Sequence, residues 1–283
     1  MREDPSAGID LSIAQQEEWG VPFPKALPNA AAKETADNLE QTPPGQERVM
    51  AMEELAAQYG DKLPMVIGQL TRDAGLKPEF TVLGNVDIKN SVRSELSQAY
   101  SADGIKGVLD KSSSDIASKV AVKADKFLDS DADTNIELVQ GYFQAVERLA
   151  AYRMLKGEKL GPAAESAFSD LIESNYSFQK IGGKNTRIPA KHDPVQIKRD
   201  LRRALRSISI EDVQFAPAIE ADENLRGMAF NDLSDNGSFL LNEQEDGFYL
   251  MLPYANGNRT PVRTADGKSL IEFKIEDLSG PTQ

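Results

Sequence analysis

Residues 237–278 read GSFLLNEQEDGFYLMLPYANGNRTPVRTADGKSLIEFKIEDL, and this stretch decides the fold class. Apolar and polar residues alternate in it, which is the period of a β-strand with one buried face. Three turn dipeptides separate the runs: Asp246-Gly247, Asn256-Gly257 and Asp266-Gly267. Such dipeptides tolerate the positive φ angles of tight hairpin turns. The stretch therefore predicts an antiparallel β-meander over 238–278.

The two hundred residues before the meander have the apolar spacing of amphipathic helices. Residues 134–156 show it best, because their apolar side chains recur at three- and four-residue steps. Prolines in first turns and glycines after last turns mark several helix ends. The predicted helices cover about 29–39, 42–59, 61–70, 87–100, 104–128, 134–156, 162–176 and 194–207. We expect a mainly α fold, in which helical hairpins or a bundle precede a small C-terminal antiparallel β-meander.

Composition shifts along the chain predict five segments. They are a flexible N-terminal arm (1–25), a helical domain (26–207), an irregular acidic connector (208–237), the β-meander (238–278) and a tail (279–283). Within the helical domain, we expect an extended connector at 76–86 and a polar loop at 180–194.

Repeated Pro and Gly residues break the N-terminal arm. One interpretation is a flexible end. The alternative is a segment that becomes ordered on a partner, with Trp19, Val21 and Phe23 as its anchors.

The overall charge limits the classes of partner. The 283 residues include 32 Lys or Arg and 45 Asp or Glu, for a net charge of −13. Such a chain repels nucleic acid and anionic membranes on average, so a DNA contact needs a local basic patch. The absence of cysteine excludes disulfides and thiolate metal sites. No long apolar run predicts a membrane-spanning helix, and the start lacks the pattern of a signal peptide, so we expect synthesis in the cytoplasm.

One basic patch stands out against this acidic background. Residues 184–206 hold eight Lys or Arg and only two acids. The predicted helix 194–207 places Ile197, Leu201 and Leu205 on one face and most of its cations on the rest. The candidate binding residues are Lys198, Arg199, Arg202, Arg203 and Arg206. One interpretation is a solvated face that pairs with the acidic residues at 211–223. The other is contact with a phosphate backbone or an acidic partner.

An acidic run at 129–135 resembles the opening of a calcium loop, in which carboxylates alternate along the chain. However, Thr134 stands where the sharp turn needs Gly, and Gln140 stands where a bidentate Glu should close the site. We therefore favour a capping box between Thr134 and Glu137, with the aspartates complementing the helix dipole.

No motif in the sequence predicts catalysis. Glu165-Ser166 resembles the catalytic dipeptide of lytic transglycosylases, but the Gly-Leu-Met-Gln segment that builds their sugar groove does not follow. His192 is the only histidine and lies in a predicted polar loop without a nucleophile elbow. Residues 182–184 lack the spacing of a phosphate-binding loop and predict a mobile loop. We expect no enzyme activity, no metal and no cofactor.

Three short segments carry a family resemblance. They are LIESNYSF at 171–178, the basic helix at 197–206, and PVRTADG at 261–267, which Phe273 and Asp277-Leu278 follow. In their order they resemble the C-terminal portions of large internal virion (ejection) proteins of tailed bacteriophages. The resemblance covers about residues 45–278. Proteins of that family are packed in the capsid or at the portal and leave with the DNA. Some carry a lytic transglycosylase domain elsewhere, which this chain lacks.

The resemblance implies a non-enzymatic structural or ejection component of a tailed-phage virion. We expect it to assemble with itself and with portal or tail proteins, and to contact packaged DNA without sequence specificity, since no groove-reading motif is present. Apolar helix faces and the edge of the β-meander are the expected assembly surfaces. One alternative is a cytoplasmic binding module that uses the basic helix on nucleic acid or an acidic partner. Another is a peptidoglycan-lytic enzyme with Glu165 as general acid.

Overall fold

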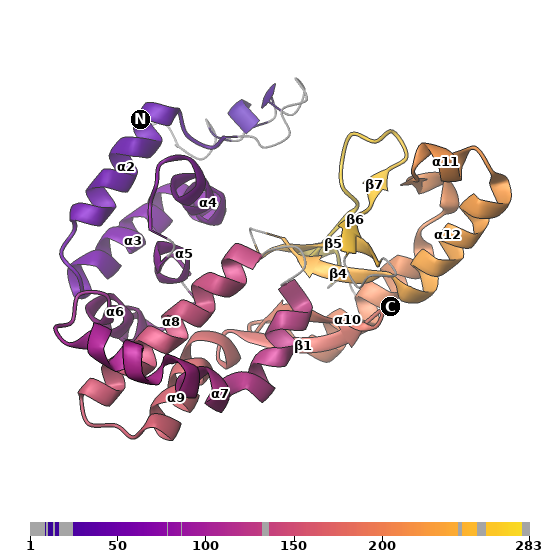
Figure 1. The fold of residues 1–283 in the computed structure, drawn as a ribbon. Helices are drawn as coiled ribbons and strands as arrows, with labels where there is room; N and C mark the ends of the chain where they lie inside the picture. Colours follow the sequence, from indigo (N-terminus) through magenta and orange to yellow (C-terminus); the bar gives the residue numbers. More distant parts are fainter. Residues whose placement is uncertain are drawn as a thin grey trace. The chain divides into compact units, whose positions relative to one another are not determined.

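The computed structural model describes residues 9, 11–13, 15–16, 25–77, 79–85, 87–131, 136–242, 245–253 and 259–278. The fold is mainly α-helical, with small antiparallel sheets in the C-terminal part, as predicted from the sequence (Figure 1). The proposed anchors Trp19, Val21 and Phe23 lie outside the described residues, as does the turn dipeptide Asn256-Gly257.

The chain divides into two compact units. Unit 1 comprises Met1–Ala121 and Gln140–Ser174, and unit 2 comprises Val122–Val139 and Asn175–Gln283. The division falls inside two helices and just before residue 175. It therefore does not follow the expected boundary between a helical domain and a connector after residue 207.

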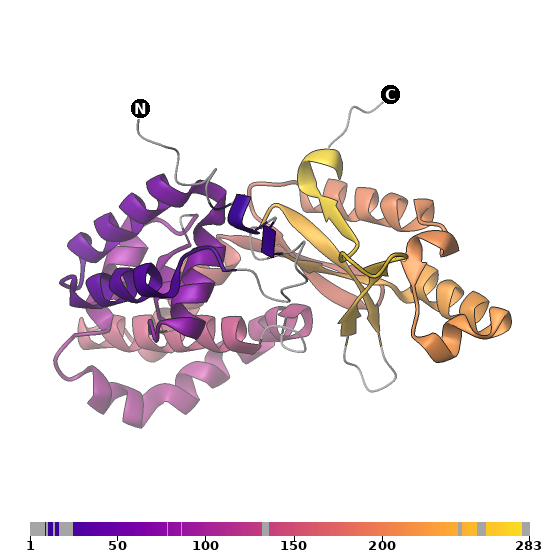
Figure 2. The same ribbon diagram turned by 90° about the horizontal axis from the view of Figure 1, so that it is seen from above.

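Unit 1 is built from helices. In chain order they are α2 (Asn29–Gln41), α3 (Gln46–Tyr59), α4 (Leu63–Asp73), α5 (Glu79–Leu83), α6 (Asn90–Ala99), the first part of α7 (Ile105–Asp131), most of α8 (Ile136–Leu155) and α9 (Leu160–Phe168), which continues into a π-helical turn (Ser169–Glu173). Seen from above, α2 and α3 lie among the other helices of this unit (Figure 2).

Helices α3 and α4 form the helical hairpin that the sequence predicts. A single 3-10 turn over Gly60–Lys62 joins them, and Gly60 takes a positive φ of 54°. The hairpin buries Met52 on α3 and Val66 and Leu70 on α4. Pro64 stands in the first turn of α4, where a missing N–H costs little.

The expected extended connector at 76–86 is wrong over part of its length. It contains the short helix α5, which buries Phe80, Val82 and Leu83. The guanidinium of Arg48 lies 5.1 Å from the centre of the Phe80 ring and 3.6 Å from the Glu79 carboxylate. Because these stabilising contacts come from a helix thirty residues away, the local sequence does not reveal the turn of helix.

Unit 2 contains the predicted β-meander. Its sheet consists of β4 (Ser238–Leu241), β5 (Gly247–Pro253), β6 (Arg259–Pro261) and β8 (Glu272–Lys274), all antiparallel. β5 is central, with β4 along one edge and β6 and β8 along the other. A second small ladder pairs β3 (Val213–Gln214) with β7 (Arg263–Thr264). The short helix α13 (Ile275–Leu278) follows β8.

The turn between β4 and β5 is wider than the two-residue turn that Asp246-Gly247 predicts. β4 ends at Leu241, and the positive φ falls on Glu245 rather than on the glycine. The side-chain oxygen of Asn242 accepts hydrogen bonds from the backbone N–H groups of Asp246 (3.1 Å) and Gly247 (3.3 Å). An asparagine side chain therefore closes this turn in place of a tight backbone turn.

A β-hairpin replaces the polar loop expected at 180–194 and the last part of the helix expected to reach Tyr176. Strands β1 (Tyr176–Ile181) and β2 (Lys184–Pro189) pair antiparallel through a two-residue turn, Gly182-Gly183. Both glycines have positive φ, 59° and 84°. Two successive positive φ angles define the turn type that suits a two-residue hairpin.

The segment expected to be an irregular acidic connector, 208–237, contains regular structure. It holds a 3-10 turn (Ile210–Asp212), β3, and helices α11 (Pro217–Glu220) and α12 (Glu223–Asn236). The Asp222 side chain accepts hydrogen bonds from the N–H groups of Asn224 (2.9 Å) and Leu225 (3.2 Å), so it caps α12. Acidic residues in this segment therefore begin a helix.

Candidate functional site

The basic helix forms as the sequence predicts. It is α10, Pro194–Ser207, with Pro194 in its first turn. The Asp193 side chain caps it by accepting hydrogen bonds from the N–H groups of Val195 (2.8 Å) and Gln196 (3.3 Å). The apolar face of α10 is buried, through Ile197, Leu201 and Leu205.

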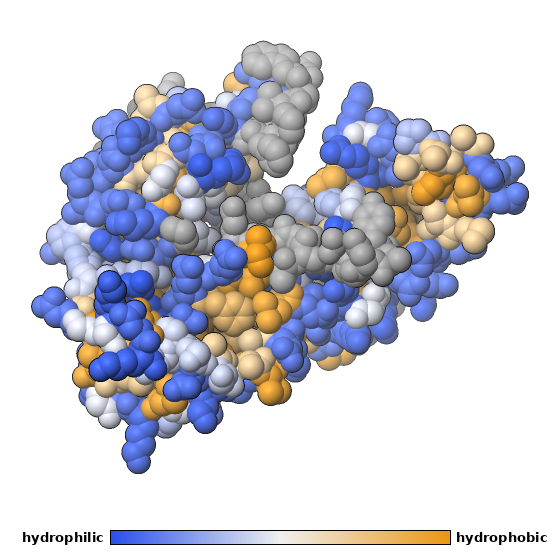
Figure 3. Space-filling model, in the orientation of Figure 1, coloured by the Kyte–Doolittle hydropathy of each residue, from blue (hydrophilic) through white to orange (hydrophobic). Residues whose placement is uncertain are grey.

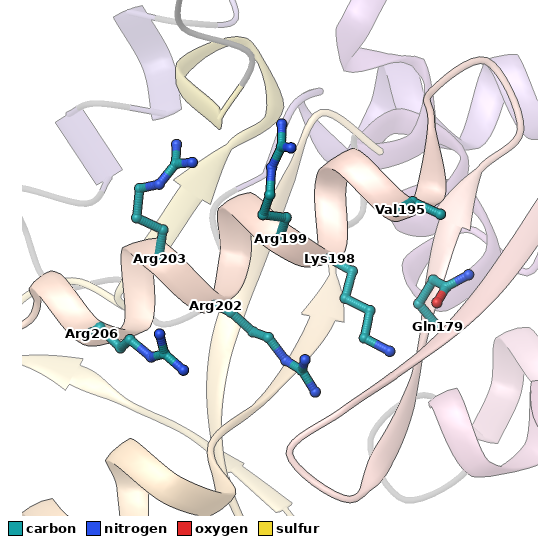
Figure 4. Close-up of a pocket in the computed structure, with 7 residues that line it drawn as sticks. All are labelled: Gln179, Val195, Lys198, Arg199, Arg202, Arg203 and Arg206. Carbon is teal, nitrogen blue, oxygen red and sulfur yellow. The ribbon is translucent and has the colours of Figure 1, made fainter. Parts of the chain in front are cut away.

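The other faces of α10 carry all five predicted cations. They border a shallow depression of about 620 Å³, which Val195 and Gln179 of strand β1 complete. Its lining residues are Gln179, Val195, Lys198, Arg199, Arg202, Arg203 and Arg206. In Figure 4, Arg199 and Arg203 point to one side of the helix, and Lys198 and Arg202 point to the other. We call the five cations the cationic face of α10.

One acid within the helix neutralises part of this face. Asp200 is 3% exposed, and its carboxylate lies 3.2 Å from Arg203 and 3.8 Å from Arg199. The side chain of Gln196 also donates a hydrogen bond to it. In the sequence, Asp200 is only one of the two acids within the basic patch. The structure shows that it anchors the arginines of one side.

The remaining cations form a row that has no partner among the residues the structure describes. Lys198, Arg202 and Arg206 follow one another at four-residue steps, which in a helix spaces them about 6 Å apart along the axis. Within the described part of the chain, no ion pair or hydrogen bond engages their charged groups. Arg202 and Arg206 are exposed, and Lys198 is partly exposed. Three positive charges therefore face solvent along one side of the helix.

The acidic residues after α10 do not neutralise this row. Glu211 and Glu220 pair instead with Arg226, at 3.1 and 3.3 Å. Asp212 accepts a hydrogen bond from the backbone of Ser209, and Asp222 caps α12. Among the residues whose placement is described, no ion pair joins α10 to the acidic segment. The pairing that the solvated-face interpretation predicts is therefore not seen there.

Two other basic residues of the 184–206 patch serve the interior of unit 2. Arg187 is 4% exposed and binds Asp131 through two nitrogens, at 3.1 and 3.3 Å. It also binds Glu245 at 3.0 Å and stacks 4.5 Å from the centre of the Tyr176 ring. Lys184 lies 3.3 Å from Asp129. These cations hold the β1–β2 hairpin and are not part of the cationic face.

Asp129, the first residue of the calcium-like run, binds this hairpin. Asp129 accepts hydrogen bonds from the backbone and side-chain N–H groups of Asn185, both at 2.8 Å. Burial raises the pKa of Asp129, but hydrogen bonds from Asn185 and Lys184 outweigh it and lower that pKa below its usual value. Thr134, the start of the expected capping box, lies outside the described residues. Within the described ranges, no three His, Cys, Asp or Glu side chains are placed to hold a metal ion.

The structure places the residues considered for catalysis or phosphate binding on α9, in the β1–β2 turn and in the loop before α10. Glu165 is exposed on α9, whereas the general acid of a lytic transglycosylase is a buried carboxyl. Its neighbour Ser166 accepts a hydrogen bond from Arg153 at 2.8 Å. Gly182-Gly183 forms the hairpin turn, and His192 donates its backbone N–H to Pro189 in the loop before α10.

Gln179 and Val195 lie beside the cationic face, although no charge pattern marks them in the sequence. Gln179 reaches the depression from the β1–β2 hairpin, which the Gly182-Gly183 dipeptide signals. Val195 is 68% exposed, although it is apolar.

A scan against protein-family models, a search of curated proteins and a search of solved structures each find no match to this chain. None of the helices in the described ranges is long and apolar enough to cross a membrane.

Proposed function

We propose that this chain is a non-enzymatic component of a tailed-phage virion that contacts packaged DNA through the cationic face of α10. The observation that carries the proposal is the row of Lys198, Arg202 and Arg206, which has no described partner within the chain. The resemblance of residues 45–278 to internal virion proteins gives the setting. Assembly with further copies and with portal or tail proteins is part of the same proposal.

Phosphate is a suitable ligand for this row on chemical grounds. Guanidinium groups bind phosphate oxygens through paired N–H donors, and a lysine adds a point charge. The depression is shallow and contains no aromatic side chain that could stack on a base. Contacts of this kind follow the DNA backbone without reading sequence.

The proposal predicts the salt dependence of binding. Three phosphate contacts give a slope of about −2.7 in log affinity against log salt, so affinity should fall about 40-fold from 50 to 200 mM salt. Fluorescence anisotropy with a labelled duplex of arbitrary sequence measures this slope. The net charge of −13 opposes binding to DNA, most strongly at low salt. Measurable binding at low salt therefore requires that the three cations contact the same duplex together.

A matched pair of variants tests the site. Lys198→Gln/Arg202→Gln/Arg206→Gln should abolish the salt-dependent binding. The control removes three exposed lysines from α7, Lys106, Lys111 and Lys119, by the same change to Gln, and should bind like wild type. Equal binding by both variants, or binding that ignores salt, would contradict the proposed site.

The virion setting needs its own test. Mass spectrometry of purified phage particles should detect the chain in particles, at a constant ratio to the portal protein. Its absence from particles, with DNA binding intact, would favour the cytoplasmic binding module instead.

A further inference from the structure

Strand β1 is the free edge of its hairpin. Among the described strands it pairs only with β2. The other side of β2 lies against β4, where the hydroxyl of Thr186 donates a hydrogen bond to the carbonyl oxygen of Phe239 (3.4 Å). Helix α10 packs along β1. An edge strand presents backbone N–H and C=O groups that a further strand can bind.

The pairing register shows which backbone groups of β1 face outward. The two-residue turn makes Ile181 and Lys184 the closing pair of the hairpin, and a closing pair of this kind exchanges both of its hydrogen bonds. Pairs with and without hydrogen bonds alternate along an antiparallel ladder, so Phe178 and Lys180 belong to pairs without them. Their N–H and C=O groups therefore point away from β2, and no described group binds them.

Positive charge lies beside this edge. Gln179, the residue between the two outward-facing ones, completes the depression that Lys198 and Arg202 border. Figure 4 shows Lys198 and Arg202 extending to the side of α10 on which Gln179 lies. Lys180 is exposed on the edge itself. A strand that binds β1 therefore meets cations from α10 and from β1.

The surroundings of β1 are not suited to a partner that binds by apolar contact. Exposed apolar side chains of unit 2 gather instead at its α11–α12 end, where Leu225 is 46% and Met228 67% exposed (Figure 3). The depression beside β1 is cationic apart from Gln179 and Val195. Recognition at the β1 edge therefore depends on backbone hydrogen bonds and on charge.

We propose that β1 binds an extended acidic segment of a partner protein, which adds as a further strand beside α10. Its backbone pairs with the outward N–H and C=O groups of Phe178 and Lys180. Side chains at every second position of the added strand point to the side of the sheet that α10 covers, about 6.6 Å apart. That spacing is close to the step of about 6 Å along the row of Lys198, Arg202 and Arg206.

Acidic residues at alternate positions are therefore the expected signature of the partner. A lysine on an edge strand opposes pairing with most other strands, so Lys180 favours an acidic one. This inference goes beyond the proposed DNA contact and does not depend on it.

A synthetic peptide tests the charge match. The probe is acetyl-Thr-Glu-Val-Glu-Val-Glu-Thr-amide, in which the three glutamates share one face of the strand. A matched peptide carries Gln in place of each Glu. Fluorescence anisotropy should show saturable binding of the acidic peptide to the full chain. The Gln peptide should bind at least about tenfold more weakly, because its charge pairs with the row on α10 are lost. Equal binding of the two peptides would overturn the assignment of an acidic partner.

A matched pair of variants tests the backbone pairing. Lys180→Pro removes the N–H that faces away from β2, and an edge position of this kind tolerates proline. Lys180→Gln removes the same charge but keeps the N–H. The acidic peptide should bind Lys180→Pro about tenfold more weakly than Lys180→Gln, because a backbone hydrogen bond is lost. Equal affinities, in variants that circular dichroism shows to be folded, would overturn the strand addition.

Hydrogen exchange measured by NMR tests the same pairing in the unaltered chain. The amide protons of Phe178 and Lys180 should exchange quickly in the free protein and slowly with the acidic peptide bound. Those of Gln179 and Ile181, which bind β2, should be protected in both states. A peptide that does not bind, or that binds without protecting Phe178 and Lys180, would overturn the proposal.

Discussion

Replacing Arg187 with Met should remove a buried ion pair of unit 2. The guanidinium is buried against Asp131, which is 1% exposed, and also binds Glu245 and stacks on Tyr176. Methionine fills much of the same volume but carries no charge. The substitution therefore leaves the Asp131 carboxylate buried without its cation.

The size of the effect follows from this burial. Removing one partner of a buried ion pair costs about 3–5 kcal/mol in free energy of unfolding. The hydroxyl of Ser130 still donates a hydrogen bond to Asp131, so we expect the lower end, about 3 kcal/mol. The pair of Lys184 with Asp129 is partly exposed, at 26% and 33%, and Lys184→Gln should cost less than about 1 kcal/mol.

Urea denaturation followed by circular dichroism measures both changes. A second variant, Arg187→Met/Asp131→Leu, removes both charges and should recover much of the lost stability, since an apolar pair can replace a buried ion pair. If Arg187→Met cost no more than Lys184→Gln, or if the double variant were less stable still, the ion pair would not have the importance assigned to it.

Three further predictions test other features. Gly182→Ala should destabilise the chain by about 3 kcal/mol, because φ is +59° there and the new Cβ would lie 2.0 Å from the carbonyl oxygen of Gly237. Gly183→Ala, whose new Cβ meets no atom within 4 Å, should cost clearly less in the same urea assay. Equal costs would contradict the clash. The pKa of Asp129 is lowered in the folded chain, because hydrogen bonds from the hairpin outweigh burial. The ionised carboxylate therefore stabilises the fold at pH values above the ordinary Asp pKa of about 3.9. This stability is lost as the pH falls through the lower pKa of the folded chain. Asp129→Asn should lose less free energy of unfolding on acidification than wild type does. An equal loss in both proteins would refute this assignment. Asp200→Asn should raise DNA affinity a few-fold and steepen the salt slope by about one contact, because it frees the neighbouring arginines; an unchanged slope would show that they do not reach phosphate.

Local patterns predict the regular elements of this chain well. Alternation and glycine-containing turns predict the β-meander, and Asp193-Pro194 at the start of the basic helix matches the observed first turn of α10. These signals need only neighbouring residues. The α3–α4 hairpin is predicted for the same reason, since Gly60 ends one helix where the next begins.

The β1–β2 hairpin could not be predicted from hydropathy, although its Gly182-Gly183 turn was visible. Strand β2 reads as polar, yet four of its six residues are buried, including Arg187. The acid that permits this burial, Asp131, stands 56 residues earlier in the chain. Only the folded structure brings the two together.

The same limit applies to the cationic face. Sequence alone counts eight basic residues between 184 and 206 as one patch. The structure assigns them different roles: Arg187 serves the interior, Arg203 is paired with Asp200, and Arg202 is left facing solvent. Whether a cation is free to bind a partner depends on where distant acids lie after folding. The candidate site is therefore the part of the basic patch that folding leaves unpaired, and a charge count along the sequence overstates it.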